Sequence, residues 1–277
     1  MPFKILLSIA LIYIGTLSSI GQNIELSGQV KAADGVVLEF VNIGIQNKDI
    51  GTVSDKNGLF FLNIPPSNQK DSITVSYVGY FNKTLSIEEM IKKSPETILL
   101  KLNPFQLDEV IINNSEKKEL KLGTQSYSNW VVGYVKSKND SNNDIQEFVK
   151  KIKIKKASQV LNVNINLFNI KQETAIFRVN FYNVKDGLPF QKINRSGILF
   201  DQPISEGWNQ LDLTQYDLKF DTDFFVSIEY IPQSGGQEEP FNYRGKLFGK
   251  SIKRTASQGE WNITRGATIS MYVTVIQ

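Results

Sequence analysis

The chain has 277 residues with 31 Lys and Arg against 28 Asp and Glu, so its formal net charge is only +3. This length accommodates two ordinary domains, and so small a charge excludes a strongly basic nucleic-acid-binding protein. The sequence has 0 Cys and 0 His. It therefore excludes disulfides, thiol nucleophiles, His-containing triads, Cys/His zinc sites and a lipid anchor attached to cysteine.

Residues 1–21 resemble a secretory signal peptide. Lys4 provides the positive start, the following residues are mostly apolar, and Ser19 and Gly21 are small residues of the kind found before a cleavage site. The alternative is a single membrane anchor, but the apolar run is short for a hydrocarbon core of about 30 Å. We therefore expect an exported chain, cleaved near Gly21, that is periplasmic or associated with the outer membrane or cell surface and has no transmembrane span.

The stretch at residues 51–62 predicts two strands joined by a tight turn. β-favouring residues precede the turn, and apolar residues recur at every second position after it. The turn chemistry comes from Asp55, whose carboxylate can accept a backbone hydrogen bond, and from Asn57 and Gly58, which tolerate positive φ angles. We expect a β-hairpin here.

Further β patterns lie on both sides of this turn, at residues 26–30, 40–45, 73–78, 98–102 and 110–112. One short helix is predicted at residues 86–93. Ser86 and Glu89 have the spacing of a capping box, and Pro95 ends the helix.

Five motifs in this order resemble the carboxypeptidase-regulatory-like domain of exported Bacteroidetes proteins. They are Ser27-Gly28-Gln29-Val30, Phe40-Val41-Asn42-Ile43, the stretch from Gly51-Thr52 to Phe60, Ser76-Tyr77-Val78-Gly79-Tyr80, and Leu107-Asp108-Glu109-Val110-Ile111-Ile112. The resemblance implies a seven-stranded, transthyretin-like β-sandwich over residues 22–112 that is itself non-catalytic.

Residues 113–123 are polar and charged, which predicts a linker between two domains. Residues 124–277 predict a second β domain, because apolar and polar residues alternate at 152–155, 161–167, 177–182, 207–213, 224–230 and 271–275. Such alternation is typical of an antiparallel sandwich or jelly roll with one face in the core and one face polar. The sequence thus predicts an all-β chain, a transthyretin-like sandwich followed by a jelly-roll-like sandwich.

This second half also resembles the jelly-roll region that follows the regulatory-like domain in exported proteins of the Flavobacteria type. The matching pieces are Phe177-Arg178-Val179-Asn180-Phe181-Tyr182, Gly187-Leu188-Pro189, Gly207-Trp208 and Phe225-Val226-Ser227-Ile228-Glu229. The resemblance implies a binding or structural module without known catalytic residues.

The three tryptophans, Trp130, Trp208 and Trp261, are candidates for ligand binding. A flat aromatic ring can stack on the apolar face of a pyranose, and exposed aromatic side chains also mark protein interfaces. The alternative is that they fill the core or its rim. Trp208 precedes an alternating strand and favours the core or rim, whereas Trp261 lies near a predicted loop and is the better platform candidate.

Six carboxylates cluster in sequence around the strand that contains Trp208: Asp201, Glu206, Asp212, Asp217, Asp221 and Asp223. Two of them could act as an acid and base pair if they lay roughly 5–9.5 Å apart, or several could hold a structural calcium ion. The alternative is that each one supports a turn. The turn at Asp55 is not expected to bind calcium, because its twelfth position is Pro66 and further oxygen ligands are missing.

Two surface features remain. A basic face is predicted on one strand, where it could contact an anionic polysaccharide or keep a sheet edge soluble; its residues are Lys150, Lys151, Lys153, Lys155 and Lys156. Asp71-Ser72-Ile73 resembles the O-glycosylation motif of exported Bacteroidetes proteins.

These features predict a non-catalytic, exported cell-envelope protein that acts through preformed β-sandwich surfaces. Its expected partner is an envelope protein or a polysaccharide, without nucleic acid and without a cofactor. Two alternatives stay open: a carbohydrate-binding module that uses an exposed tryptophan, and a carboxylate-dependent hydrolase.

Overall fold

The computed structural model describes residues 22–104, 118–136, 138–139, 142–194, 196–233 and 237–277. In this part of the chain the expected all-β architecture is confirmed. The described helices are α2 (Ile87–Lys93) and the short 3-10 turns η1 (Pro66–Asn68) and η2 (Thr214–Tyr216). No described helix has the length and apolar character needed to cross a bilayer. The predicted signal peptide at 1–21 and the predicted strand at 110–112 lie outside the described residues.

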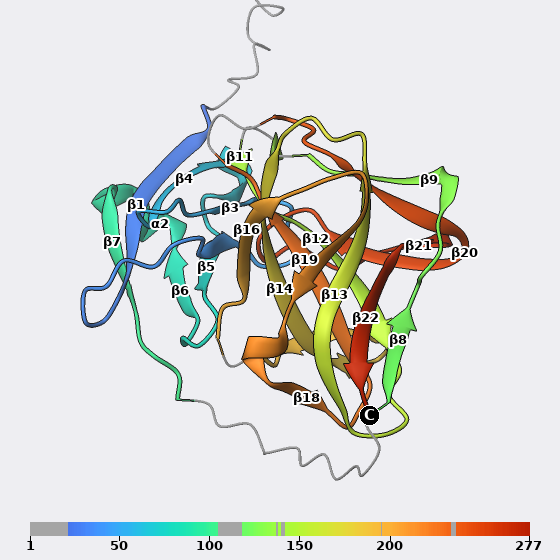
Figure 1. Ribbon diagram of the computed structural model, residues 1–277. Helices are drawn as coiled ribbons and strands as arrows, with labels where there is room; N and C mark the ends of the chain where they lie inside the picture. The colour runs from blue at the N-terminus through green and yellow to red at the C-terminus, as the bar shows by residue number, and fades with distance from the viewer. Residues whose placement is uncertain (1–21, 105–117, 137, 140–141, 195, 234–236) are drawn as a thin grey trace, which may run out of the picture.

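The first half is a sandwich of two sheets (Figure 1). The three-stranded sheet has the order β4-β1-β7 and the four-stranded sheet has the order β3-β2-β5-β6. Apolar side chains from both sheets, among them Leu26, Ile43 and Ile73, form one buried core. The strands are β1 (Ile24–Ala32), β2 (Asn42–Ile45), β3 (Gly51–Val53), β4 (Leu59–Ile64), β5 (Ser72–Ser76), β6 (Lys83–Ser86) and β7 (Glu96–Leu100).

The predicted hairpin at residues 51–62 is wrong. The turn itself is present: the Asp55 carboxylate accepts backbone hydrogen bonds from Asn57 and Leu59, both at 2.8 Å, and Gly58 has a φ of 69°. However, β3 pairs with β2 and β4 pairs with β1, so the chain crosses here from one sheet to the other. A period-two pattern shows which face of a strand is buried, but it does not select the neighbouring strand.

Two local expectations near this core also need correction. Phe40 lies outside β2 in a left-handed conformation, with a φ of 54°, and its ring is buried. The capping box is not formed, since Ser86 precedes α2 without a side-chain cap hydrogen bond. The helix instead docks on the sandwich through its buried residues Ile87 and Met90.

The second half is dominated by one sheet of 13 strands. Its main path runs β15-β14-β19-β12-β20-β13-β22-β8, and it curls so that β14 and β13 bury side chains in the same core. The predicted strands of this half are confirmed except at residues 152–155, where the observed strand ends at Ile152. The strands are β8 (Glu119–Gly123), β9 (Ser128–Tyr134), β10 (Lys138–Asn139), β11 (Asn142–Asn143), β12 (Gln146–Ile152), β13 (Ser158–Phe168), β14 (Thr174–Lys185), β15 (Leu188–Lys192), β16 (Leu199–Pro203), β17 (Gly207–Asp212), β18 (Leu218–Phe220), β19 (Phe224–Ile231), β20 (Asn242–Arg254), β21 (Asn262–Ile269) and β22 (Met271–Ile276).

Part of the predicted linker is a strand of this sheet. β8 pairs with β22, and its alternate residues Leu120 and Leu122 pack against the core of the second half. Two apolar side chains are enough to hold this short segment in the sheet, because the edge of β22 supplies backbone hydrogen-bonding groups to it. Residues 113–117 lie outside the described part, so the domain boundary itself stays a prediction.

The two halves pack directly against each other. Phe40 and Val53 of the first half join a buried cluster with residues of the second half. Two glycines allow the backbones to approach closely: a Cβ on Gly44 would lie 2.2 Å from the Ser257 carbonyl oxygen, and one on Gly51 would lie 2.5 Å from the Asp144 carboxylate. Any larger residue would force the halves apart at these points.

Candidate functional site

A row of four charged residues crosses four neighbouring strands of the large sheet. Arg178 on β14 lies opposite Glu229 on β19, which lies opposite Glu147 on β12, which lies opposite Arg254 on β20. Residues directly opposite each other project from the same face of a sheet. This face is turned toward the first half, and all four side chains are buried.

The charges in this row are paired at short distances. Nη1 of Arg178 lies 2.7 Å from Oε1 of Glu229, and Nε of Arg254 lies 2.6 Å from Oε2 of Glu147. The amide of Asn180 joins the two pairs by donating to Glu147 at 3.1 Å and to Glu229 at 2.8 Å. Buried charges are tolerated when they are paired and hydrogen-bonded in this way.

Further donors complete the network. The hydroxyl groups of Tyr182 and Ser227 both donate to Glu147, and the amide of Asn42, from the first half, donates to Glu229 at 3.0 Å. Burial by itself raises the pKa of Glu229, but the cationic neighbours, Arg178 first, bring its pKa well below the ordinary 4.5. Glu229 is therefore a stable carboxylate at neutral pH.

Arg178 connects the network to the first half. Its guanidinium donates to the side-chain oxygen of Asn42 and to the backbone carbonyl of Phe40. A planar guanidinium with several donors suits such a multidentate position better than a lysine does. The charged row thus also holds the two halves together.

A cleft of about 520 Å³ lies between the halves beside this network. The first half lines it with residues that include Tyr77 and Tyr80, whose ring centroids are 5.6 Å apart. From the second half, Gln258 bridges the cleft by donating to the hydroxyl of Ser76 at 2.7 Å. The charged and aromatic side chains of the second half that line the cleft are Arg178, Tyr182, Phe190, Lys192 and Arg254.

Lys192 is the least well paired cation in the cleft. Its Nζ lies 3.8 Å from Oε2 of Glu229, whereas each arginine has a carboxylate within 2.7 Å. Its side chain is 26% exposed. Burial lowers its pKa to about 8, against the opposing influence of Glu229 and Glu147.

The sequence interpretation missed this site. It treated the polar positions of β14 and β19 as an outer, polar face, but Arg178, Asn180 and Glu229 lie between the two halves of the molecule. A signal was present in the sequence, since charged residues at alternating positions of otherwise apolar strands are costly to bury unless they meet opposite charges. The residues Tyr77 and Tyr80 came from a motif that the sequence identified only as part of the fold.

The three tryptophans lie in different surroundings. Trp261 is partly buried: its ring meets that of Tyr182 edge-on at 5.6 Å, and the guanidinium of Arg254 lies 4.8 Å from its centroid. Trp208 packs edge-on against Tyr272 at 4.9 Å. Trp130 on β9 is 88% exposed, so it rather than Trp261 presents an open aromatic face.

The carboxylates near Trp208 are not assembled into one site, since all of them except Asp221, for which no contact is seen among the described residues, serve separate turns and ion pairs. Asp212 accepts from the backbone and hydroxyl of Thr214, and Asp223 accepts from the backbone of Ile154 and pairs with Lys151 at 3.1 Å. The others include Glu206, which accepts from the backbone of Asn169, Asp217, which pairs with Lys219, and Asp201, which pairs with Lys56. Among the described residues, no group of three or more His, Cys, Asp or Glu could hold a metal ion.

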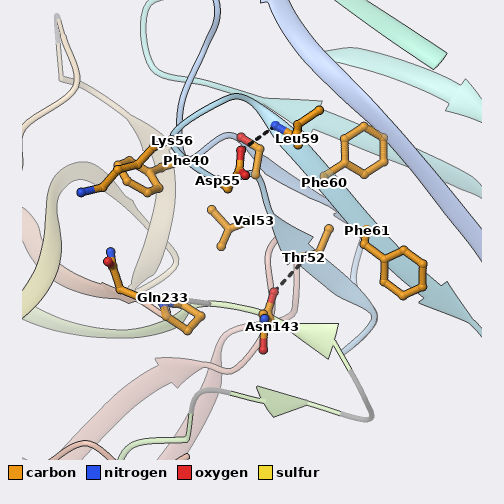
Figure 2. Close-up of a pocket in the computed structure, with 12 residues that line it drawn as sticks. Phe40, Thr52, Val53, Asp55, Lys56, Leu59, Phe60, Phe61, Asn143 and Gln233 are labelled. Atoms are coloured by element: carbon orange, nitrogen blue, oxygen red, sulfur yellow. Dashed lines mark hydrogen bonds between the residues drawn. The ribbon is translucent and has the colours of Figure 1, made fainter. Parts of the chain in front are cut away.

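A second hollow, of about 510 Å³, lies beside the Asp55 turn (Figure 2). Phe40, Val53 and Phe61 of the first half line it together with Gln233 of the second half. The Asp55 carboxylate points back into its own turn and accepts the backbone hydrogen bond of Leu59 that is drawn in Figure 2. It is committed to the turn, as expected, and is not aimed at a ligand.

The predicted basic face is wrong. β12 ends at Ile152, so three of the five lysines lie beyond the strand. The two on the strand are adjacent and point to opposite faces: Lys150 donates to the hydroxyls of Thr124 and Thr268, and Lys151 pairs with Asp223. Ser72 of the O-glycosylation-like motif is exposed at the start of β5.

Comparison with known proteins identifies a domain family for the first half. Residues 26–112 match the family model of the CarboxypepD_reg-like domain, whereas no curated protein sequence matches the chain. Among solved structures, the chain is similar to the cysteine protease and lectin-like domains of Cwp84, a surface layer associated protein of Clostridium difficile. The identity is 9% and the TM-score 0.39, and the match covers 85% of this chain and 57% of that chain. It is also similar to the infectious bursal disease virus VP2 subviral particle, at 9% identity with a TM-score of 0.30, covering 91% of this chain and 63% of that chain.

The chain thus spans less than two thirds of the length of both structures, and likenesses this weak carry no argument about its activity. The family match does carry an argument about the fold, because the matched residues coincide with the seven-stranded sandwich of the first half. The chain therefore contains a carboxypeptidase-regulatory-like domain at residues 26–112.

Proposed function

We propose that the chain is a non-catalytic binding protein that recognises its ligand in the cleft between its two halves. The observation that carries this proposal is the charged wall of the cleft. Arg178 and Arg254 are each fixed by a buried carboxylate, so their positions are set before a ligand arrives. A preorganised polar wall in a concave site lowers the ordering cost of binding.

The same geometry argues against catalysis by the two buried carboxylates. Glu147 accepts from Tyr182, Ser227, Asn180 and Arg254, so its oxygens are already occupied. A general acid needs a raised pKa and access to the substrate, but Glu229 has a lowered pKa and is fully buried. Hydrogen bonds to the charged form of a carboxylate make it a weak base.

We expect this protein to be exported and to act in the cell envelope. The signal-peptide-like pattern at residues 1–21 supports export, and the regulatory-like domain supports a non-catalytic role for the first half. In this proposal the first half is one wall of the site as well as a spacer. The partner is an envelope polysaccharide or protein that offers a small group to the cleft.

A glycan array tests this function. The purified chain should be retained on at least one class of glycan, and Tyr80→Ala should lose that retention because it removes half of the aromatic pair in the cleft. Trp130→Ala is the matched control, since it removes an exposed ring on another strand. The same glycans, incubated in solution and examined by mass spectrometry, should stay unchanged. Turnover that is abolished by Glu147→Gln would overturn the proposal.

The exposed ring of Trp130 favours a second candidate, a carbohydrate-binding module that uses a surface platform. The two candidates differ in the same experiment. Loss of glycan retention in Trp130→Ala but not in Tyr80→Ala would place binding on β9 and away from the cleft.

A further inference from the structure

The cleft has more positive than negative charge. The cations Arg178, Arg254 and Lys192 line it, while the buried carboxylates beside them are Glu147 and Glu229. Each arginine occupies one carboxylate at hydrogen-bonding distance, and Lys192 lies 3.8 Å from Oε2 of Glu229, an oxygen that already accepts from Asn180. The other oxygen, Oε1, accepts from Arg178 and Asn42. The three cations therefore share two carboxylates, and Lys192 has the longest ion pair of the three.

This lysine is held at a cost. Removing an ammonium group from water with only a shared carboxylate at 3.8 Å disfavours its charged form, and burial lowers the pKa of Lys192 to about 8. The group is still mostly protonated at pH 7. An anion in the cleft would compensate the lost hydration with a charge-assisted hydrogen bond.

The rest of the lining indicates what the anion is attached to. Tyr77 and Tyr80 form a tilted ring pair, and amide side chains that can hydrogen-bond hydroxyl groups are present at Asn82, Asn103 and Gln191. A pyranose presents an apolar face to aromatic rings and a rim of hydroxyl groups to amides. A bare inorganic anion would leave these rings and amides unused.

We infer that the cleft binds an acidic saccharide, with the carboxylate of a uronic acid unit paired to Lys192 and the sugar ring against Tyr77 and Tyr80. This inference rests on the proposed function and names the ligand class for the same site. The volume of about 520 Å³ falls within the range of small-molecule sites. Lys192 is the residue that selects an acidic over a neutral sugar.

Trp261 provides a reporter of binding, because its ring contacts Tyr182 and Arg254, both of which line the cleft. In a full-length chain that carries Trp130→Phe and Trp208→Phe, its fluorescence should change on titration with tri-galacturonic acid. The neutral α-1,4-galactotriose is the matched probe, as it has the same rings without the carboxylates. We expect the acidic trisaccharide to bind at least tenfold more tightly at pH 7.

Substitutions separate charge from shape. Lys192→Met should lower the affinity for the acidic trisaccharide at least tenfold and leave the affinity for the neutral one unchanged. Lys192→Arg should keep the preference for the acidic trisaccharide. Lys246→Met, which removes an exposed lysine of β20 outside the cleft, should change neither affinity. Circular dichroism and thermal melting of each variant show whether it is folded.

The outcomes are distinguishable. Equal affinity for both trisaccharides, or a preference for the acid that survives in Lys192→Met, would overturn this inference while leaving cleft binding intact. Binding of inorganic phosphate or of a tripeptide carboxylate in place of tri-galacturonic acid would also overturn it. A chain that responds to no saccharide, in fluorescence or on the array, would overturn the inference and leave an envelope protein as the ligand of the proposed function.

Discussion

Arg178 gives the sharpest test of how the two halves are joined. It belongs to the second half, yet its guanidinium binds Glu229 from its own half and both the side chain and the backbone of the first half, at Asn42 and Phe40. Arg178→Met keeps most of the aliphatic stem and removes the charge. It leaves Glu229 buried with Lys192 as its remaining cation within 4 Å.

The expected loss of stability follows from this geometry. Removing one partner of a buried ion pair costs about 3–5 kcal/mol, because the other charge stays buried after losing its closest cation. For a protein of this size, a loss of that order lowers the melting temperature by roughly 6–20 °C. Unfolding in urea, followed by circular dichroism and by tryptophan fluorescence, measures the loss.

The chain offers a matched control. Lys56 and Asp201 also form an ion pair across the two halves, but at 3.5 Å and with both side chains more than half exposed. Exposed pairs contribute about 0–1 kcal/mol, so Lys56→Met should have a small effect. A double-mutant cycle of Arg178→Met with Asn42→Ala should show a coupling of about 0.5–3 kcal/mol. Equal effects of the two single Met substitutions, or an additive cycle, would refute the reasoning.

Three further predictions concern single residues. Gly44→Ala should destabilise the chain in urea, since its Cβ would lie 2.2 Å from a backbone oxygen of the other half, whereas at Gly197 the nearest atom is 3.8 Å away and the same change should be mild. Trp261→Ala should cost about 1–3 kcal/mol through its lost aromatic and cation–π contacts, while Trp130→Ala should stay within about 0.5 kcal/mol. Burial raises the pKa of Asp144 from 3.8 to about 7, so the folded state holds a proton that the unfolded state releases between these values. The corresponding stability, up to about 4 kcal/mol, is present below pH 4 and lost as the pH rises through 7, and Asp144→Asn should remove this part of the slope.

Each of these has an outcome that would contradict it. Equal destabilisation by the two glycine substitutions would show that the close approach between the halves is not tight. Equal melting temperatures for the two tryptophan variants would show that the ring of Trp261 is not engaged. An unchanged pH slope in Asp144→Asn, measured by urea unfolding between pH 4.5 and 8, would show that this carboxyl group does not titrate in that range.

Much of the architecture was determined by the sequence itself. Alternating apolar residues placed the strands that became β13, β14, β17, β19 and β22, because a strand that faces a core must repeat with a period of two. The turn at Asp55 was equally local, since its carboxylate bonds to the backbone within four residues. The ordered motifs were sufficient to identify the fold of the first half, which the match at residues 26–112 confirms.

Only the tertiary structure decided which strands are neighbours. β3 and β4 are adjacent in sequence but lie in different sheets, because backbone hydrogen bonds can be satisfied by any strand with a compatible edge. The same reason explains the linker residues that became β8 and paired with the C-terminal strand β22.

The candidate site depended on this long-range pairing. Glu147, Arg178, Glu229 and Arg254 come from four separate strands, and only the registers between those strands place them in one row. From the sequence each of them reads as an ordinary charge on a polar face. Packing of the first half over that face buried the charges, which is why they pair with one another and form the wall of a cleft.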